Sequence, residues 1–96
     1  MIKNFKHKGL KIFFKEGSER GVIREHATKL RNILVRLEIC THPKQMDLPG
    51  LNFHQLKGQK KDYYSLTISG NWRVIFKFDG NNVTDVDYLD YHGRSK

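Results

Sequence analysis

The sequence has 96 residues, of which 38% are hydrophobic and 11% aromatic, enough for one small core. This composition excludes a disordered chain, and no apolar run approaches the roughly 18 residues of a membrane span. The net charge is +8, and residues 1–61 carry fourteen Lys and Arg against five Asp and Glu. Such an asymmetric basic field suits a polyanion, most often nucleic acid, although an acidic protein partner or simple solubility would also explain it.

The first half of the chain predicts a short strand followed by two helices. Residues 2–5 alternate briefly, as a strand does. Residues 8–15 place apolar side chains on one face and lysines on the other, and Gly17 ends this first helix. A second helix is predicted to open at Ser18 or Gly21. Its apolar stripe, spaced by four and three residues, consists of Ile23, Ala27, Leu30, Leu34 and Leu37.

The second half of the chain predicts four strands. The second helix ends before Pro43, and residues 53–58 then alternate as a short strand. Residues 63–78 form a hairpin pattern, two alternating runs joined at Gly70-Asn71, and residues 83–91 predict the last strand. The order β-α-α-β-β-β-β indicates an α+β fold, in which two N-terminal helices pack on a twisted, mainly antiparallel sheet of four to five strands.

The chain is expected to form one domain over residues 1–92, with residues 93–96 as a frayed tail. The N-terminus leads into no uninterrupted apolar stretch, so a cytoplasmic location is expected. The single Cys40 lies among apolar helix residues, where a buried unreactive thiol is the expected state. His42 stands two residues further on, but no second Cys/His pair has zinc-site spacing, and no metal or other cofactor is expected.

Polar residues that no core requires gather in the second half of the sequence. They are His54, Lys57, Arg73, Asp90, Tyr91 and His92. In a four-stranded meander the end of the last strand lies near the start of an adjacent strand, and these groups could line one concave face. Their chemistry suits phosphodiester cleavage by internal attack of a ribose 2′-OH. That reaction needs a base, cations for the charge on phosphorus and an acid for the leaving 5′-oxygen.

Four segments together resemble the HigB toxins of bacterial toxin–antitoxin systems, in the RelE-like ribonuclease superfamily. They are residues 2–10, Leu56-Lys57-Gly58, residues 71–76 and Asp90-Tyr91-His92, and they span nearly the whole chain. The resemblance implies a compact domain that enters the ribosomal A site, on the small subunit of the ribosome, and cuts mRNA there without a metal, inhibiting translation. It also implies a neutralising HigA-type helix-turn-helix antitoxin, with DNA contacted only through that complex.

Carried over residue by residue, the resemblance makes those six polar residues the catalytic set. His92 is expected as the general acid or base, and Asp90 as the group that orients or tunes a neighbouring cation. Tyr91 would position a base by stacking or through its hydroxyl. Lys57 and Arg73 would hold the scissile phosphate.

Several further residues have two open interpretations. His54 has either a second proton-transfer role or a structural one. Asn71 has an amide that matches the donor–acceptor pair of an adenine edge, but it also suits a turn. Tyr63 and Tyr64 could stack on bases or serve as core and edge cover. The lysines expected to contact rRNA are Lys6, Lys8, Lys11, Lys15, Lys60 and Lys61.

Two other function classes remain open. A non-catalytic RNA- or DNA-binding module would use the same basic face and would bind with a strong salt dependence. A catalytically degenerate toxin, retained for antitoxin binding and operon regulation, would keep the fold and lose the cleavage. Toxicity on expression and the state of RNA ends distinguish these from an active ribonuclease.

Overall fold

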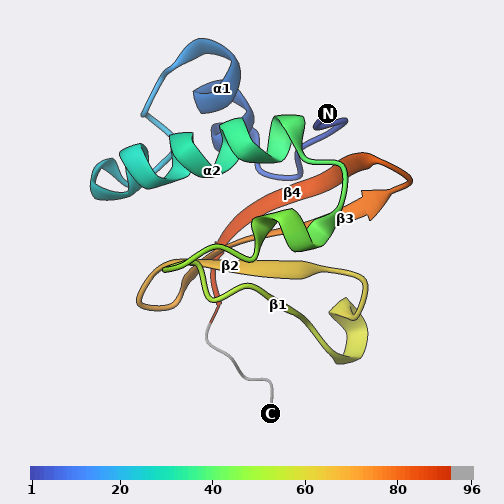
Figure 1. Ribbon diagram of the computed structural model, residues 1–96. Coiled ribbons are helices and arrows are strands. Elements are labelled where there is room, and N and C mark those ends of the chain that lie inside the picture. Colours follow the sequence, from blue (N-terminus) through green and yellow to red (C-terminus); the bar gives the residue numbers. More distant parts are fainter. Residues whose placement is uncertain (92–96) are drawn as a thin grey trace.

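The computed structural model describes residues 1–91 and has the predicted α+β architecture (Figure 1). Two α-helices, α1 (Lys8–Glu16) and α2 (Ala27–Ile39), lie on the same side of a four-stranded sheet. Its strands are β1 (His54–Gln55), β2 (Tyr64–Ser69), β3 (Trp72–Asp79) and β4 (Asn82–Asp90). They follow one another in the order β1-β2-β3-β4, and every neighbouring pair is antiparallel.

The N-terminal segment adds a fifth, irregular row to the sheet at the free edge of β4. Ile2 and Phe5 form isolated parallel bridges with Val83 and Val86. The N–H of Lys3 donates to Val83 O at 2.7 Å, and a similar bond of 2.8 Å joins residues 6 and 86. Residues 2–5 therefore lie where the predicted first strand would lie, and they pair with the last strand of the sheet.

Helix α1 has a clear start and a clear end. The His7 side chain accepts a hydrogen bond from the Leu10 N–H at 2.9 Å, and so satisfies one of the unpaired donors of the first turn. Gly17 ends the helix with a φ of 80°, a left-handed conformation that glycine adopts without steric cost. Leu10 and Phe13 bury the apolar face in the core, as the sequence predicts.

Helix α2 begins later than predicted, at Ala27 after a 3-10 turn over Arg24–His26. The chain before it is held by tertiary contacts that a helical pattern does not reveal. Gly21 passes so close to α1 that a Cβ placed on it would lie 2.6 Å from Gly9 Cα. The Ile23 N–H donates to the Tyr88 hydroxyl at 3.3 Å instead of entering a helical ladder.

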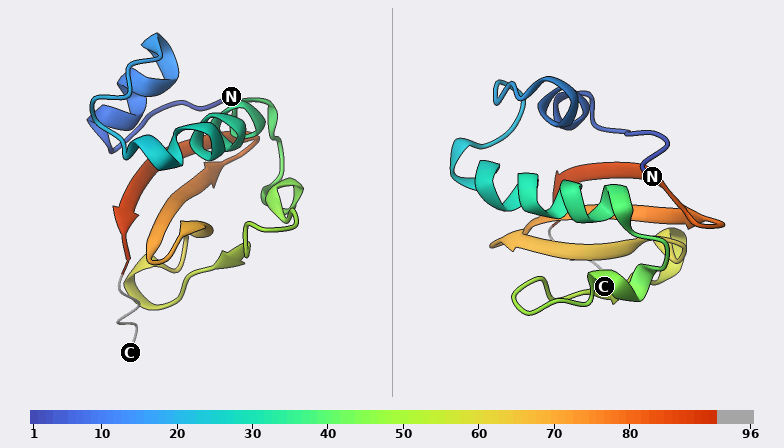
Figure 2. Two further views of the ribbon diagram at one scale, coloured as in Figure 1. Left: turned by 90° about the vertical axis from the view of Figure 1, so that its left-hand side faces the viewer. Right: turned by 45° about the horizontal axis from the view of Figure 1, so that its top comes forward.

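The apolar stripe of α2 nevertheless forms the centre of the core. Its buried residues are Ala27, Leu30, Ile33, Leu34 and Leu37. Ile23, predicted as the first residue of the stripe, is only half-buried and precedes the helix. Figure 2 shows α2 lying across one face of the sheet. The two helices and one face of the sheet thus share a single core.

The strand predicted over residues 53–58 is reduced to the two residues of β1. Asn52 and Gly58 have φ values of 49° and 72°, so the chain leaves the extended conformation on both sides of the strand. The connection after α2 also contains a 3-10 turn, Pro43–Met46, that was not predicted. The His42 ring accepts from the Lys44 N–H at 3.1 Å and so begins that turn.

The hairpin of β2 and β3 is confirmed, with Gly70 at a φ of 54° in the turn. Strict alternation then gives the sheet two different faces. The helix-covered face carries Leu66, Val74 and Phe76. The opposite face, called here the open face, includes Tyr63, Ser65, Thr67, Arg73, Ile75, Lys77, Thr84, Asp87, Leu89 and Tyr91.

Cys40 is 2% exposed, and its thiol donates to the His42 carbonyl oxygen at 3.0 Å. Burial raises the pKa of this thiol, which keeps it protonated and unreactive, as expected from the sequence. Within residues 1–91, no helix is both long and apolar enough to cross a membrane.

Candidate active site

A hollow of ≈ 370 Å³ lies beside β1, at the side of the sheet where β4 ends. Three of the predicted catalytic residues line it: His54, Lys57 and Tyr91. They come from the two-residue edge strand β1, from the segment just after it and from the residue that follows β4, more than thirty residues further along the sequence. The remaining lining residues are Gln55, Leu56 and Gly58.

The exposed His54 ring is oriented by its own backbone. Its Nδ1 lies 2.9 Å from the carbonyl oxygen of Asn52. A carbonyl oxygen can only accept a hydrogen bond, so Nδ1 carries the proton and Nε2 of the neutral ring keeps its lone pair. Asn52 adopts a φ of 49°, a left-handed conformation that Asn tolerates better than most residues. The strained residue thus fixes the tautomer that leaves a base available.

Lys57 and Tyr91 reach the hollow from different segments. Lys57 is exposed, in an extended conformation just before the turn at Gly58. The Tyr91 N–H donates to the Asn71 carbonyl oxygen at 2.7 Å, which ties the end of β4 to the hairpin turn. The half-buried Tyr91 side chain packs against an apolar cluster formed by Leu56, Tyr63 and Ile75. This packing holds the Tyr91 ring in place.

Arg73 and Asn71 do not line this hollow. Arg73 points to the open face as predicted, but its Nη1 donates to the carbonyl oxygens of Gly70 and Trp72, at 2.7 and 3.2 Å. Its guanidinium group thus closes its own hairpin turn. Asn71 is exposed in that turn, and its carbonyl oxygen already accepts the hydrogen bond from Tyr91.

Asp90 is also separate from the hollow. It pairs with Trp72, so by alternation it belongs to the opposite side of the sheet from Tyr91. The structure thus divides the predicted set and brings three of its members together. His92, expected as the principal acid or base, lies outside the described residues.

The sequence interpretation missed two hydroxyl groups on the open face between His54 and Arg73. Ser65 pairs with His54 across β1 and β2, and Thr67 pairs with Arg73 across β2 and β3. Both hydroxyl oxygens are buried and have no hydrogen-bond partner within the described part of the chain. Alternation in residues 63–67 could have indicated them, because it places Ser65 and Thr67 on the same face as Arg73.

The lysines expected to contact rRNA fall into two groups, apart from Lys6. Lys8, Lys11 and Lys15 are exposed on α1, on the helix-covered side of the sheet. Lys60 and Lys61 are exposed in the turn before β2. The remaining member, Lys6, extends to the ring of Tyr63.

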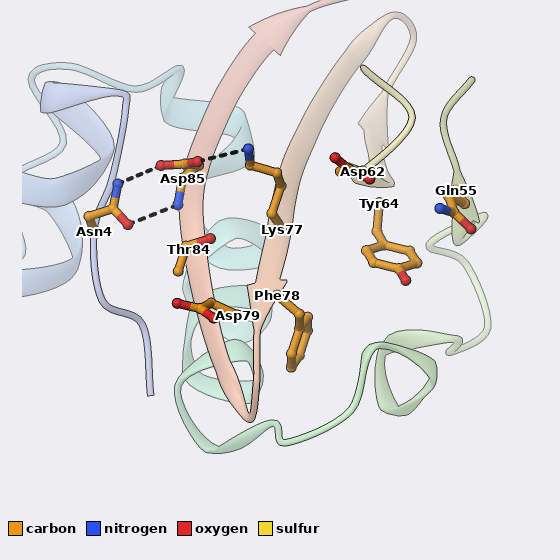
Figure 3. Close-up of a pocket in the computed structure, with 9 residues that line it drawn as sticks. All are labelled: Asn4, Gln55, Asp62, Tyr64, Lys77, Phe78, Asp79, Thr84 and Asp85. Carbon is orange, nitrogen blue, oxygen red and sulfur yellow. Dashed lines mark hydrogen bonds and ion pairs between the residues drawn. The ribbon is translucent and has the colours of Figure 1, made fainter. Parts of the chain in front are cut away.

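A second hollow, of ≈ 550 Å³, has the wrong charge for RNA (Figure 3). Asp62, Asp79 and Asp85 line it against the single cation Lys77, and this excess of carboxylates would repel a phosphate inside the hollow. Figure 3 shows that Asp85 is held between Asn4 and Lys77. Among the described residues, no group of three or more His, Cys, Asp or Glu side chains is arranged to hold a metal ion.

Comparison with known proteins supports the resemblance that the sequence motifs suggest. Residues 3–92 match the family model described as "RelE-like toxin of type II toxin-antitoxin system HigB". The chain is also 35% identical to a Proteus vulgaris protein named "Endoribonuclease HigB", over 92 residues that cover 96% of this chain and 100% of that protein. The chain therefore belongs to the HigB-like family of RelE-like toxins of type II toxin–antitoxin systems.

Proposed function

We propose that this protein is a ribosome-dependent endoribonuclease that cuts mRNA in the A site by attack of a ribose 2′-OH on the adjacent phosphodiester. The observation that carries the proposal is the convergence of His54, Lys57 and Tyr91 on one hollow. These side chains supply a base, a cation and an aromatic surface, and no two of them are neighbours in sequence. The relative named as an endoribonuclease supports the same chemistry.

In the proposed mechanism, Nε2 of His54 takes the proton of the attacking hydroxyl, because Nδ1 is already committed to Asn52. Lys57 stabilises the charge that develops on the phosphate, and Tyr91 holds a nucleobase of the mRNA in place by stacking. His92 follows Tyr91 in sequence and is the proposed acid for the leaving 5′-oxygen.

The remaining predicted site residues have supporting roles in this proposal. Arg73 stiffens the hairpin turn through its backbone acceptors and keeps a positive charge beside the bound strand. Asn71 is exposed in that turn, so its amide is accessible to an adenine edge. Asp90 tunes a neighbouring cation.

The ribosome supplies what the small site lacks. Positioning of the reacting groups alone can lower a barrier by about 7–11 kcal/mol. A protein of 96 residues can therefore rely on the A site to fix the mRNA, with Lys8, Lys11, Lys15 and Lys61 binding rRNA. The proposed partner that blocks the activity is a HigA-type antitoxin, and one domain over residues 1–92 carries the whole function.

The first prediction concerns Lys57 and His54. We expect Lys57→Ala and His54→Ala each to lower the rate of mRNA cleavage by about 10²–10⁴-fold, the range that a positioned charge or proton-transfer group contributes. The measurement is primer extension on mRNA from a translation reaction, with and without ribosomes. Lys44→Ala is the matched control, because Lys44 is an equally exposed lysine on the 3-10 turn outside the hollow.

Each alternative predicts a different result. Uncut mRNA beside tight, salt-dependent RNA binding would indicate a non-catalytic binding module. Uncut mRNA with tight antitoxin binding would indicate a degenerate toxin. Full activity of both alanine variants, in folded form, would remove the hollow as the active site.

A further inference from the structure

Three lysine side chains from distant parts of the chain surround the ring of Tyr63. The Nζ atoms of Lys6, Lys60 and Lys77 lie 5.9, 5.4 and 5.2 Å from the ring centroid. Lys6 precedes α1, Lys60 lies in the turn before β2, and Lys77 is on β3. We call these three residues the lysine cluster. Neither Lys77 nor Tyr63 has a role in the proposed cleavage mechanism, which does not explain why the three charges converge.

Carboxylates neutralise only part of this charge. Lys77 Nζ lies 3.3 Å from Asp85 Oδ2, and this is the only ion pair under 4 Å within residues 1–91. A hydrogen bond from Asn4, assisted by Lys77, holds the pKa of Asp85 below its usual range, so Asp85 stays charged. Asp87 and Asp85 also attract Lys6, but neither forms an ion pair with it under 4 Å. Lys6 and Lys60 therefore approach the same ring without a close carboxylate in the described chain.

Tyr63 explains how like charges are held together. Its face attracts cations, and its hydroxyl accepts a hydrogen bond from Lys6 Nζ at 3.4 Å. The ring is 8% exposed and packs in the cluster with Leu56 and Ile75, so its position is fixed. Lys6 and Lys60 remain exposed, with ammonium donors that an incoming anion can reach. Because the ammonium groups repel one another, an anion bound beside them gains chiefly from Lys6 and Lys60, since Lys77 is already paired with Asp85.

The lysine cluster is continuous with the candidate active site. The Leu56 N–H donates to the Tyr63 carbonyl oxygen at 2.9 Å, and Leu56 lines the hollow. Tyr91, on the far side of that hollow, packs against the same apolar cluster as Tyr63. Surfaces that bind single-stranded RNA combine cations that follow the backbone with aromatic rings for the bases.

We propose that the lysine cluster binds a backbone phosphate of the mRNA strand, on a nucleotide close to the bond that is cut. This inference rests on the proposed function for the identity of the strand. It reassigns Lys6 and Lys60, expected from the sequence to contact rRNA, to the substrate. Lys77 is held by Asp85 and adds positive charge at short range. The ring of Tyr63 holds the three lysine side chains close together.

The test compares two double variants that lose the same charge. Lys6→Gln/Lys60→Gln removes the two unpaired members of the cluster, and Lys3→Gln/Lys44→Gln removes two exposed lysines outside it. The probe is a short single-stranded RNA with 2′-O-methyl groups, which cannot be cut because the attacking hydroxyl is blocked. Binding is measured by fluorescence anisotropy at several salt concentrations. Each phosphate is also replaced, one at a time, by an uncharged methylphosphonate.

We expect one methylphosphonate to weaken binding of the wild type and of the control pair severalfold, and to have no effect on Lys6→Gln/Lys60→Gln. The salt slope of that variant should fall by about 0.7 for the lost phosphate contact. The inference is overturned if every methylphosphonate affects the variant as it affects the wild type, or if the wild type does not bind at low salt. Loss of ribosome binding with unchanged oligonucleotide binding would instead return both lysines to rRNA.

Cleavage is scored separately, so the two proposals can fail independently. Phosphate-specific binding without any mRNA cleavage would leave the lysine cluster as an RNA site and remove the nuclease proposal. Ribosome-dependent cleavage that is unaffected in Lys6→Gln/Lys60→Gln, together with unselective methylphosphonate effects, would retain the nuclease and remove this inference.

Discussion

His26 is the residue on which the site-bearing hairpin depends for its position. It is 7% exposed, with Nδ1 2.7 Å from the Tyr88 hydroxyl and Nε2 2.9 Å from the Ser69 hydroxyl. Its ring also meets the edge of Trp72, with centroids 5.8 Å apart. One imidazole at the start of α2 thus joins the ends of β2 and β4, next to the turn that carries Asn71.

We expect His26→Ala to lower the free energy of unfolding by about 2–4 kcal/mol. It leaves a small cavity in the core and removes the hydrogen bonds from the imidazole to the buried Tyr88 hydroxyl and to Ser69. Urea denaturation measures the change. His54→Ala is the control, because His54 is exposed and its replacement should cost less than about 1 kcal/mol. Equal losses for the two variants would show that the buried network contributes little to stability.

The N-terminal segment is held to β4 by a bulge. The register between Ile75 and Lys77 shifts by one residue on the β4 side, where Asp85 has a φ of 52°. This turns Asp85 toward the Asn4 side chain, whose Nδ2 donates to Asp85 Oδ1 at 2.7 Å and whose Oδ1 accepts from the Asp85 N–H at 3.1 Å. A distortion in one strand therefore fixes a segment about eighty residues away in sequence.

Asp85 should make stability depend on acid pH. Its pKa is lowered in the folded protein, chiefly by the Asn4 hydrogen bond, so it stabilises the fold above the unfolded pKa of about 3.9. This contribution is lost as the pH falls from about 5 through the folded pKa. We expect Asp85→Asn, which tolerates positive φ, to lose less stability than the wild type between pH 5 and 3 in urea titrations. Parallel pH profiles would contradict this.

At the scale of the whole molecule, the basic charge is divided between two sides of the sheet. Lys8, Lys11 and Lys15 project from α1 on the helix-covered side. The lysine cluster and Lys57 lie on the other side, with the hollow. A molecule measuring 33 × 29 × 24 Å can therefore contact two different RNA surfaces at the same time.

We expect Lys8→Gln/Lys11→Gln/Lys15→Gln to weaken ribosome binding at least tenfold and to leave the affinity for a short single-stranded RNA unchanged. The three lysines of α1 lie on the side of the sheet away from the hollow, so they should not contact a short RNA bound there. Each phosphate contact contributes separately to the salt dependence of binding. Sedimentation with ribosomes and anisotropy with the RNA give the two affinities. A parallel loss in both assays would argue against two separate RNA surfaces.

Alternation and helical spacing were sufficient to predict the hairpin, the last strand, α1 and the core stripe of α2. They failed where a distant contact decides the local conformation. The chain before Ala27 follows Gly9 and Tyr88 rather than its own helical pattern. Likewise, the extended segment that contains β1 lies between Asn52 and Gly58, both of which have positive φ, and no period of hydrophobicity reports these two turns.

For the candidate site, residue types were easier to predict than geometry. Of the six predicted residues, His54, Lys57 and Tyr91 share the hollow, and their catalytic roles stay a prediction. The direction of the Arg73 guanidinium group and the side of the sheet to which Asp90 belongs depend on turn closure and register, which sequence spacing does not determine. The convergence of three lysines on Tyr63 was also beyond reach, because it joins residues 6, 60 and 77.

The pairing of residues 2–5 with β4 has a consequence for folding during translation. Residues 2–5 are translated long before residues 83–86, and they acquire their hydrogen-bond partners only when residues 83–86 have emerged. Contacts of such high contact order form late and slowly. The nascent chain therefore cannot complete its sheet until β4 has been made and is free to pair, and every shorter nascent chain leaves residues 2–5 without their partners.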